Sequence, residues 1–339
     1  MMTFNEYIDY AKTHILEFLP PEYIGAEVRV ETIQKMNEQY TGLIIKPEGR
    51  DSVPVANMNI YYERYMQVDD LNASMRDISN MLQTAIPPEI SEELMKDYDK
   101  LKEKLFVRVN PAAECGSIAE NSPCRTEGDL LMTYHIFIDV PDEGFMSARI
   151  TNEIAQDLGL DLKQLHEDAI ANTAVIMPVK VQSMMAAITG IEEDDPTMLV
   201  ISNEQGVFGA GALFCEGVMD QVADRFNGNY FLLPSSTHEW IAVPDNGKFN
   251  RADLEEMVRS ANQTVVDPVD RLSDNVFHYD SQEKIFELAE HFETRTAEKA
   301  AERHADKGSL LGKLQDKKEH LDIGEQSGRG IHRQPGIAI

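Results

Sequence analysis

Cysteine is scarce in this chain of 339 residues, and its spacing follows no known pattern. The three cysteines, Cys115, Cys124 and Cys215, include no CxxC pair. An odd, sparse set of this kind argues against a disulfide framework and against a structural zinc site. We therefore expect the fold to depend on a hydrophobic core, for which a hydrophobic share of 42% is sufficient.

Long hydrophobic runs are also lacking. No stretch approaches the roughly 20 apolar residues needed to cross a bilayer. The first seven residues, MMTFNEY, have neither the basic region nor the apolar region of a signal peptide. We expect a cytoplasmic protein without a membrane segment.

Basic residues are few relative to acidic ones. The chain has 31 Lys and Arg against 59 Asp and Glu, which gives a net charge of −28. Such a surface repels phosphate backbones and anionic lipids, which argues against direct nucleic-acid or membrane binding by the folded body. The excess acid favours solubility. It is also compatible with a surface that presents carboxylates to a basic partner, or with one that imitates nucleic acid.

The organisation along the chain predicts two folded regions and a tail. We place an N-terminal α+β region at residues 1–128, a C-terminal α+β region at 129–294, and a flexible tail at 295–339. The tail has nine Lys and Arg against seven Asp and Glu and few large apolar residues. This composition is typical of disorder, although Leu310, Leu311, Leu314 and Leu321 predict a short amphipathic helix within it.

Hydrophobic periodicity predicts α+β elements throughout the body. In the N-terminal region we expect helices at 4–19, 71–85 and 92–105, a helix opening near Asn59, and strands at 28–32, 41–46 and 105–109, followed by a loop at 110–128. A buried strand at 129–140 and helices at 149–158, 161–174 and 179–188 come next. The order then becomes strands 198–202 and 209–214, helix 216–225, strands 230–233 and 239–243, and helix 249–263. This ββαββα order favours a mainly antiparallel sheet with helices on one face.

Six stretches, in order, together resemble one bacterial family. They are NIYYERY at 59–65, DLL at 129–131, ISNEQG at 201–206, LPSSTHE at 233–239, MVRSAN at 257–262 and LSDNVFHYD at 272–280. The family is catalogued as domain of unknown function 5688. The resemblance implies a protein of anaerobic Firmicutes that is often encoded within integrative or conjugative elements. It implies no particular activity.

The LPSSTHE stretch is the place to look for catalysis. Ser236, His238 and Glu239 could supply a nucleophile, a base and an acid. Ser236 and His238 share one face if the strand is regular, while Glu239 points to the other. The G-x-S-x-G elbow that positions a catalytic serine is absent. The alternative is a turn in which the hydroxyls bind backbone groups and His238 leads into a strand.

Other motifs point to no cofactor or metal. The sequence GVFGAG at 206–211 has the order GxxGxG and not GxGxxG, and it sits inside an expected hairpin instead of between a parallel strand and a helix. We interpret it as a hairpin turn. The scattered histidines form no spaced pair of metal ligands. We therefore expect no metal site and no cofactor.

These observations favour a non-enzymatic accessory protein of a mobile element that acts through contact with another protein. The motivation is the absence of a catalytic constellation, the acidic body and the tail. Two alternatives stay open, namely a hydrolase-like enzyme with Ser236, His238 and Glu239 in its site, and an acidic nucleic-acid mimic. The oligomeric state is not predicted.

Overall fold

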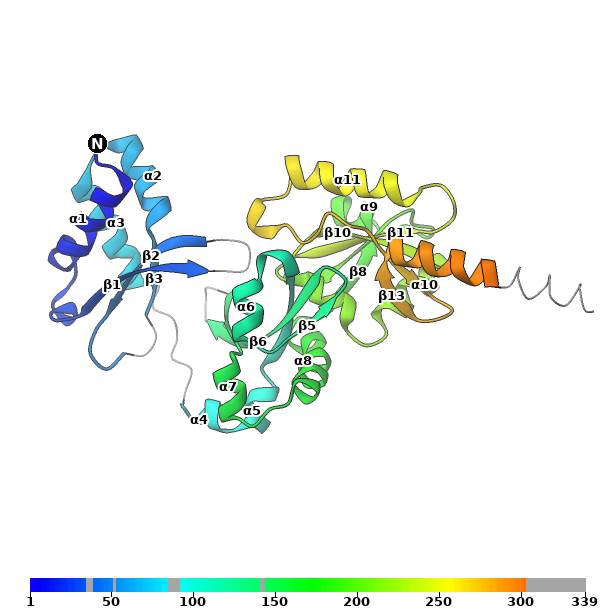
Figure 1. The fold of residues 1–339 in the computed structure, drawn as a ribbon, viewed down its shortest axis with the longest axis horizontal. Helices are drawn as coiled ribbons and strands as arrows, with labels where there is room; N and C mark the ends of the chain where they lie inside the picture. Colours follow the sequence, from blue (N-terminus) through cyan, green and yellow to red (C-terminus); the bar gives the residue numbers. More distant parts are fainter. Residues whose placement is uncertain (35–38, 51–52, 85–91, 141–143, 303–339) are drawn as a thin grey trace, which may run out of the picture. The chain divides into compact units, whose positions relative to one another are not determined.

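The computed structural model describes residues 1–34, 39–50, 53–84, 92–140 and 144–302. The chain divides into two compact units, Met1–Glu287 and Leu288–Ile339 (Figure 1). In the second unit, residues 289–302 are helical. The predicted tail helix at Leu310 to Leu321 lies outside the described residues.

The N-terminal part of the first unit is a three-stranded antiparallel sheet with helices. The strands are β1 (Glu27–Gln34), β2 (Gln39–Lys46) and β3 (Val55–Asn57), in the order β1-β2-β3. The helices are α1 (Phe4–His14), α2 (Met58–Val68) and α3 (Leu71–Thr84), and two 3-10 turns, η1 (Ile15–Phe18) and η2 (Pro21–Tyr23), follow α1. Thr3 and Glu6 form a capping box that fixes the start of α1. Helix and sheet share one core, in which Tyr7, Leu43 and Met75 are completely buried.

A second antiparallel sheet is built around one long strand. That strand, β6 (Leu130–Val140), pairs with β4 (Leu105–Pro111) on one side and with β5 (Cys124–Glu127) and β7 (Gly144–Arg149) elsewhere along its length. The helices of this part are α4 (Glu92–Lys96), α5 (Tyr98–Lys102), α6 (Gly116–Asn121), α7 (Asn152–Asp157) and α8 (Leu162–Ile176), with the 3-10 turn η3 (Ala112–Glu114). Asp161 caps α8. Helix α8 packs on β4, where the Thr173 hydroxyl accepts a hydrogen bond of 3.0 Å from the Val107 amide.

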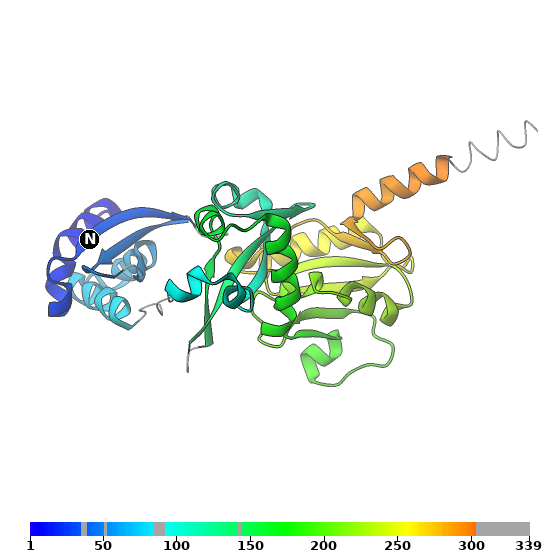
Figure 2. The ribbon, with the colours of Figure 1, turned by 90° about the horizontal axis from the view of Figure 1, so that it is seen from below.

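The third sheet has six strands in the order β13-β12-β10-β11-β9-β8, and it is coloured green to orange in Figure 2. They are β8 (Val179–Ser183), β9 (Leu199–Asn203), β10 (Tyr230–Ser236), β11 (Glu239–Pro244), β12 (Phe277–Asp280) and β13 (Ile285–Leu288). Between them lie α9 (Met184–Thr189), the 3-10 helix η4 (Gly209–Phe214), α10 (Val218–Phe226), α11 (Arg251–Thr264) and the 3-10 turn η5 (Pro268–Asp270). Asn250 caps α11, and Asn227 ends α10 with a positive φ of 54°.

The α+β class and the antiparallel pairing are confirmed, but several elements differ from the prediction. The segment 110–128 contains η3, α6 and β5 and is not a continuous loop. The segment 92–105 is two short helices, and β7 precedes the helix expected at 149–158. The segment 179–188 is not one helix: the alternating VKVQ sequence forms β8, and Ser183 then caps α9.

The largest correction concerns residues 209–214, which form η4 and not a strand. Five consecutive residues of η4, Gly209 to Leu213, are buried, and the helix packs against both β9 and β4. At Gly211 an added Cβ atom would lie 2.8 Å from the carbonyl oxygen of Val107. The small residues are therefore needed where η4 is wedged between two sheets, and the ββ pair of the ββαββα order is β8 with β9.

The predicted boundary between residues 128 and 129 runs through a paired sheet. Strand β4, on its N-terminal side, pairs with β6 on its C-terminal side over seven residue pairs, from Leu105 with Ile136 to Pro111 with Leu130. The boundary stays a prediction, but these two segments form a single sheet.

Candidate functional site

The predicted residues Ser236, His238 and Glu239 lie together on the β10–β11 hairpin. Ser236 ends β10, Glu239 begins β11, and an irregularity in the pairing separates Pro234 from Ser236. The hydroxyl of Ser236 accepts a hydrogen bond of 3.1 Å from the backbone amide of His238. Ser235 donates to the Glu239 carboxylate at 3.1 Å. The two serines thus stabilise the turn, as in the alternative interpretation of this stretch.

Both nitrogens of the His238 ring have partners. Nδ1 accepts a hydrogen bond of 3.0 Å from the amide of Phe208, and Nε2 lies 3.1 Å from a carboxylate oxygen of Asp270. Because Nδ1 accepts, the network assigns the ring proton to Nε2, which donates to Asp270. The ring therefore connects Phe208 with Asp270. Among the described residues, it forms no hydrogen bond with Ser236. A catalytic role for Ser236, His238 and Glu239 stays a prediction.

Phe208 extends this region toward the second sheet. It has a positive φ of 54°, and its ring lies 5.9 Å from the His238 ring. The guanidinium carbon of Arg108 lies 3.5 Å from the centre of the Phe208 ring, a cation–π contact. Sequence reasoning missed Phe208, Asp270 and Arg108, which are distant from the LPSSTHE stretch along the chain. The available signal was Arg108 itself, a charged residue in the apolar strand sequence LFVRV.

Arg108 is one of three residues that we name the arginine site, with His135 and Arg149. Their placement follows from strand register. Arg108 is opposite Thr133, and His135 is opposite Arg149. Directly opposite residues of antiparallel strands project to the same face, as do residues two apart on one strand. Arg108, Thr133, His135 and Arg149 therefore share one face of the β4-β6-β7 sheet.

Among the described residues, no carboxylate pairs with either of the two arginines. Neither guanidinium group forms a hydrogen bond or an ion pair within the described part of the chain, and the Nε atom of each is buried. Burial and, to a smaller extent, the charge of Arg149 lower the pKa of Arg108 to about 10, while Asp270 and Cys115 act in the opposite direction. Burial also lowers the pKa of Arg149. Two half-buried guanidinium groups thus repel each other in a protein whose net charge is −28.

His135 adds a third hydrogen-bond donor to the arginine site. Thr133 accepts a bond of 3.2 Å from Asn110, so its own proton is directed to His135 Nε2, 3.0 Å away. A neutral ring then carries its proton on Nδ1, which is buried and contacts no acceptor among the described residues. Burial lowers the pKa of His135 well below its ordinary value, and the charges of Arg108 and Arg149 contribute. The ring is therefore neutral at pH 7.

This environment predicts that His135 makes the protein sensitive to acid. The unfolded ring binds a proton below about pH 6.5 while the folded ring stays neutral, so stability is lost as pH falls. We expect the loss in unfolding free energy between pH 6.5 and 5 to be about 2 kcal/mol smaller in His135→Gln than in the wild type. Urea titrations at both pH values measure this, with His14→Gln, which alters a partly exposed histidine on α1, as control. Equal losses in the wild type and His135→Gln would contradict the assignment.

The arginine site presents donors only, which is the chemistry of anion recognition. Two guanidinium groups and an imidazole N–H complement the oxygens of a carboxylate, sulfate or phosphate group.

Within the described ranges, no three His, Cys, Asp or Glu side chains come together in a way that could hold a metal ion. Among the same residues, no helix combines the length and apolarity needed to cross a membrane.

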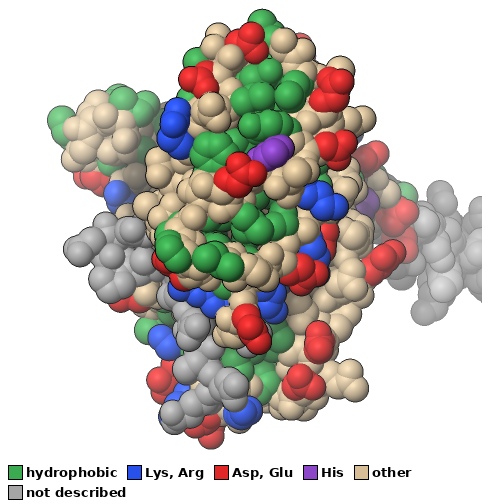
Figure 3. Space-filling model, turned by 90° about the vertical axis from the view of Figure 1, so that its left-hand side faces the viewer, with side chains coloured by type: hydrophobic (Ala, Val, Ile, Leu, Met, Phe, Trp, Pro, Cys, Tyr) green, Lys and Arg blue, Asp and Glu red, His purple; other side chains and the backbone are tan. Residues whose placement is uncertain are grey.

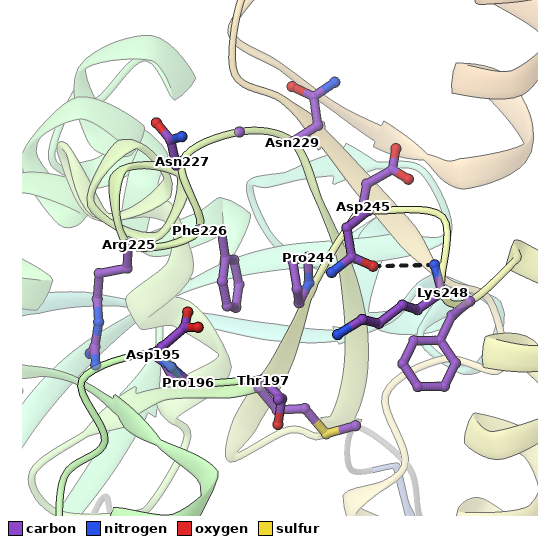
Figure 4. A pocket seen from close by; sticks show the side chains of 14 residues that line it. Asp195, Pro196, Thr197, Arg225, Phe226, Asn227, Asn229, Pro244, Asp245 and Lys248 are labelled. Carbon is purple, nitrogen blue, oxygen red and sulfur yellow. Dashed lines mark hydrogen bonds between the residues drawn. The ribbon is translucent and has the colours of Figure 1, made fainter.

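The structure also has a pocket of about 550 Å³ at the ends of α10, β10 and β11 (Figure 4). Asp195, Arg225 and Phe226 line one side, and Asp245 and Lys248 line the other. Several of its polar groups already have partners: Arg225 pairs with Glu192 and donates to the Val181 carbonyl, and Asp245 lies 3.1 Å from His278. The polar atoms of this pocket therefore give less indication of a ligand than those of the arginine site.

The model of a family of unknown function, DUF5688, matches residues 4–281, so the chain belongs to this family. No curated protein and no solved structure matches the chain. The family resemblance of the six sequence stretches is thus confirmed.

Proposed function

We propose that this protein binds an oxyanion at the arginine site and acts by binding and not by catalysis. The observation that carries the proposal is the pair Arg108 and Arg149, two half-buried cations without a carboxylate partner in the described chain. Removing a charge from water without a partner costs several kcal/mol. A bound oxyanion offsets that cost and the mutual repulsion of the two guanidinium groups.

The anion best suited to this role belongs to another protein. The body carries a large acidic excess, so a free polyanion is repelled at long range, whereas a single carboxylate or phosphate group can be delivered by a partner with basic surroundings. This agrees with an accessory protein of a bacterial mobile element that works in the cytoplasm through protein–protein contact. The scarcity of cysteine supports the cytoplasmic assignment.

The hydrolase alternative has less support. Both nitrogens of His238 are engaged, and Ser236 contacts backbone. Ester hydrolysis that disappears in Ser236→Ala would reinstate it. The nucleic-acid mimic requires carboxylates in two rows spaced like phosphates. On the face shown in Figure 3, acidic side chains are scattered among hydrophobic and neutral ones.

Replacing Arg149 by methionine tests the proposal because it separates binding from stability. Without added anion we expect the unfolding free energy of Arg149→Met to be about 1 kcal/mol higher than that of the wild type. The substitution removes the cost of burying an unpaired charge and also the repulsion between residue 149 and Arg108. With inorganic phosphate we expect the wild type to gain stability and Arg149→Met to gain none. Urea titrations with and without phosphate at constant ionic strength measure both quantities.

Arg259→Met is the matched control, since it removes one positive charge from an exposed position on α11. It should respond to phosphate as the wild type does. Equal stabilisation of wild type and Arg149→Met by phosphate would overturn the assignment of the site. A marked loss of stability in Arg149→Met without anion would indicate a structural role for the arginine.

A further inference from the structure

A second pocket, of about 440 Å³, has carboxylates, side-chain amides and one arginine in its lining. It lies between the start of β6, the end of α11 and the segment after η5, and we name it the Asp129 pocket. Its polar lining includes Asp129, Asn262, Arg271 and Asp274. Three of the six stretches that resemble the family, at 129–131, 257–262 and 272–280, contribute to it. Segments more than a hundred residues apart therefore meet at this place.

One carboxylate oxygen of Asp129 accepts two hydrogen bonds, and the other accepts none from the described residues. Oδ2 accepts hydrogen bonds from the Ser273 hydroxyl at 2.6 Å and from the Asn275 amide nitrogen at 2.9 Å. Oδ1 is buried and accepts no hydrogen bond from any described residue. Hydrogen bonds thus hold the carboxylate through Oδ2, while Oδ1 has no donor in the described part of the chain.

Asn262 has the same arrangement. Its side-chain nitrogen donates to the Ser273 carbonyl at 3.0 Å and to the Asp274 carboxylate at 2.7 Å. Two acceptors on one side fix the orientation of the amide, so Oδ1 must point the other way. Asn262 is only 4% exposed, and its Oδ1 is buried without a donor among the described residues.

Two buried acceptors without donors are costly, at about 1–3 kcal/mol each. The group that satisfies them must donate hydrogen bonds. It should also be cationic, because the ionisable side chains lining the pocket, Asp129, Asp274 and Arg271, carry a net charge of −1. A Ca²⁺ ion needs six to eight oxygen ligands, and no group of three metal-ligating acidic or histidine side chains forms in the described chain.

We infer that the Asp129 pocket receives a cationic N–H donor, an alkylammonium or guanidinium group, at the end of an aliphatic chain. Pro111, Ala113 and Leu272 provide apolar contacts for the methylene groups. The N–H groups donate to Oδ1 of Asp129 and of Asn262. The acidic surface attracts such groups at long range. This inference concerns a different site and does not depend on the proposed anion binding.

Isothermal titration of the full chain tests the inference in 150 mM NaCl. The probes are agmatine and cadaverine as free cations, and N-acetyl-lysinamide and N-acetyl-argininamide as side chains borne on a peptide. We expect Asp129→Asn, which replaces Oδ1 by a donor of the same shape, to weaken binding at least tenfold. Ala113→Phe, which fills the pocket without changing its hydrogen bonds, should do the same.

Glu256→Gln is the control, since it removes one negative charge from an exposed position of α11 and should keep wild-type affinity. Binding of the peptide-borne side chains assigns the pocket to a partner protein, whereas binding of the free cations alone assigns it to a small amine. No binding of any probe, or equal binding by wild type, Asp129→Asn and Ala113→Phe, would overturn the inference. Binding of Ca²⁺ in place of the amines would also overturn it.

Discussion

Replacing Gly209 by alanine is expected to lower the unfolding free energy by about 3 kcal/mol. A Cβ atom at this position would overlap the Ser202 hydroxyl and the carbonyl oxygen of His238, and it would lie 2.9 Å from the amide nitrogen of Asn203. Two of these atoms belong to backbone, which cannot move aside without disturbing β9 and the hairpin turn. Forcing extra volume into a packed core typically costs 1–3 kcal/mol, and backbone overlap is at the upper end.

Urea denaturation followed by circular dichroism measures this change, with Gly228→Ala as the matched variant. An added Cβ at Gly228 meets no heavy atom within 4 Å, so that variant should differ from wild type by less than about 1 kcal/mol. If Gly209→Ala were as stable as Gly228→Ala, η4 would not approach the hairpin as closely as described.

Truncating Trp240 to alanine should cost about 3–5 kcal/mol, the usual range for a buried tryptophan. Trp240 is completely buried and packs edge to face against Phe277, with 5.5 Å between ring centres, and against Phe286 at 6.1 Å. Its indole nitrogen also donates a hydrogen bond of 2.9 Å to the carbonyl of Ala210. The truncation therefore removes core volume and leaves a buried carbonyl of η4 without its donor.

Circular dichroism must follow this unfolding, because Trp240 is the sole tryptophan of the chain. Trp240→Phe keeps part of the ring contacts and should lose clearly less stability than Trp240→Ala. Similar losses for the two variants would show that the hydrogen bond to Ala210 matters more than the packing, and a loss below 1 kcal/mol for Trp240→Ala would contradict both.

Elements with local signals could be predicted from sequence. Helix α11 has Asn250 at its cap, α8 has Asp161, and the β10–β11 hairpin has alternating apolar residues around a polar turn. Each signal lies within a few residues of the element that it determines. Long-range contacts set the rest. The small residues of η4 are required by close contact with Val107 and His238. In the local sequence, glycines required by such contacts look the same as glycines required by a hairpin turn.

The candidate sites divide in the same way. Ser236, His238 and Glu239 are neighbours in sequence and do lie together, but the partners of His238 are Phe208 and Asp270. The arginine site depends on the register of three strands, and the Asp129 pocket on segments from β6, α11 and the loop before β12. Spacing rules, which detect metal ligands or nucleotide loops, do not describe residues assembled in this manner.

The position of Phe208 makes the two sheets thermodynamically linked. Its ring contacts Arg108 on the four-stranded sheet, and its amide binds His238 on the six-stranded sheet. A ligand that draws Arg108 away from this ring changes the free energy of the loop that holds the hairpin. By reciprocity, if such a ligand changes the affinity of the hairpin for a second ligand, the second ligand changes the affinity for the first by the same factor. If the arginine site binds an anion as proposed, a partner that engages the LPSSTHE turn would regulate that binding without touching either arginine.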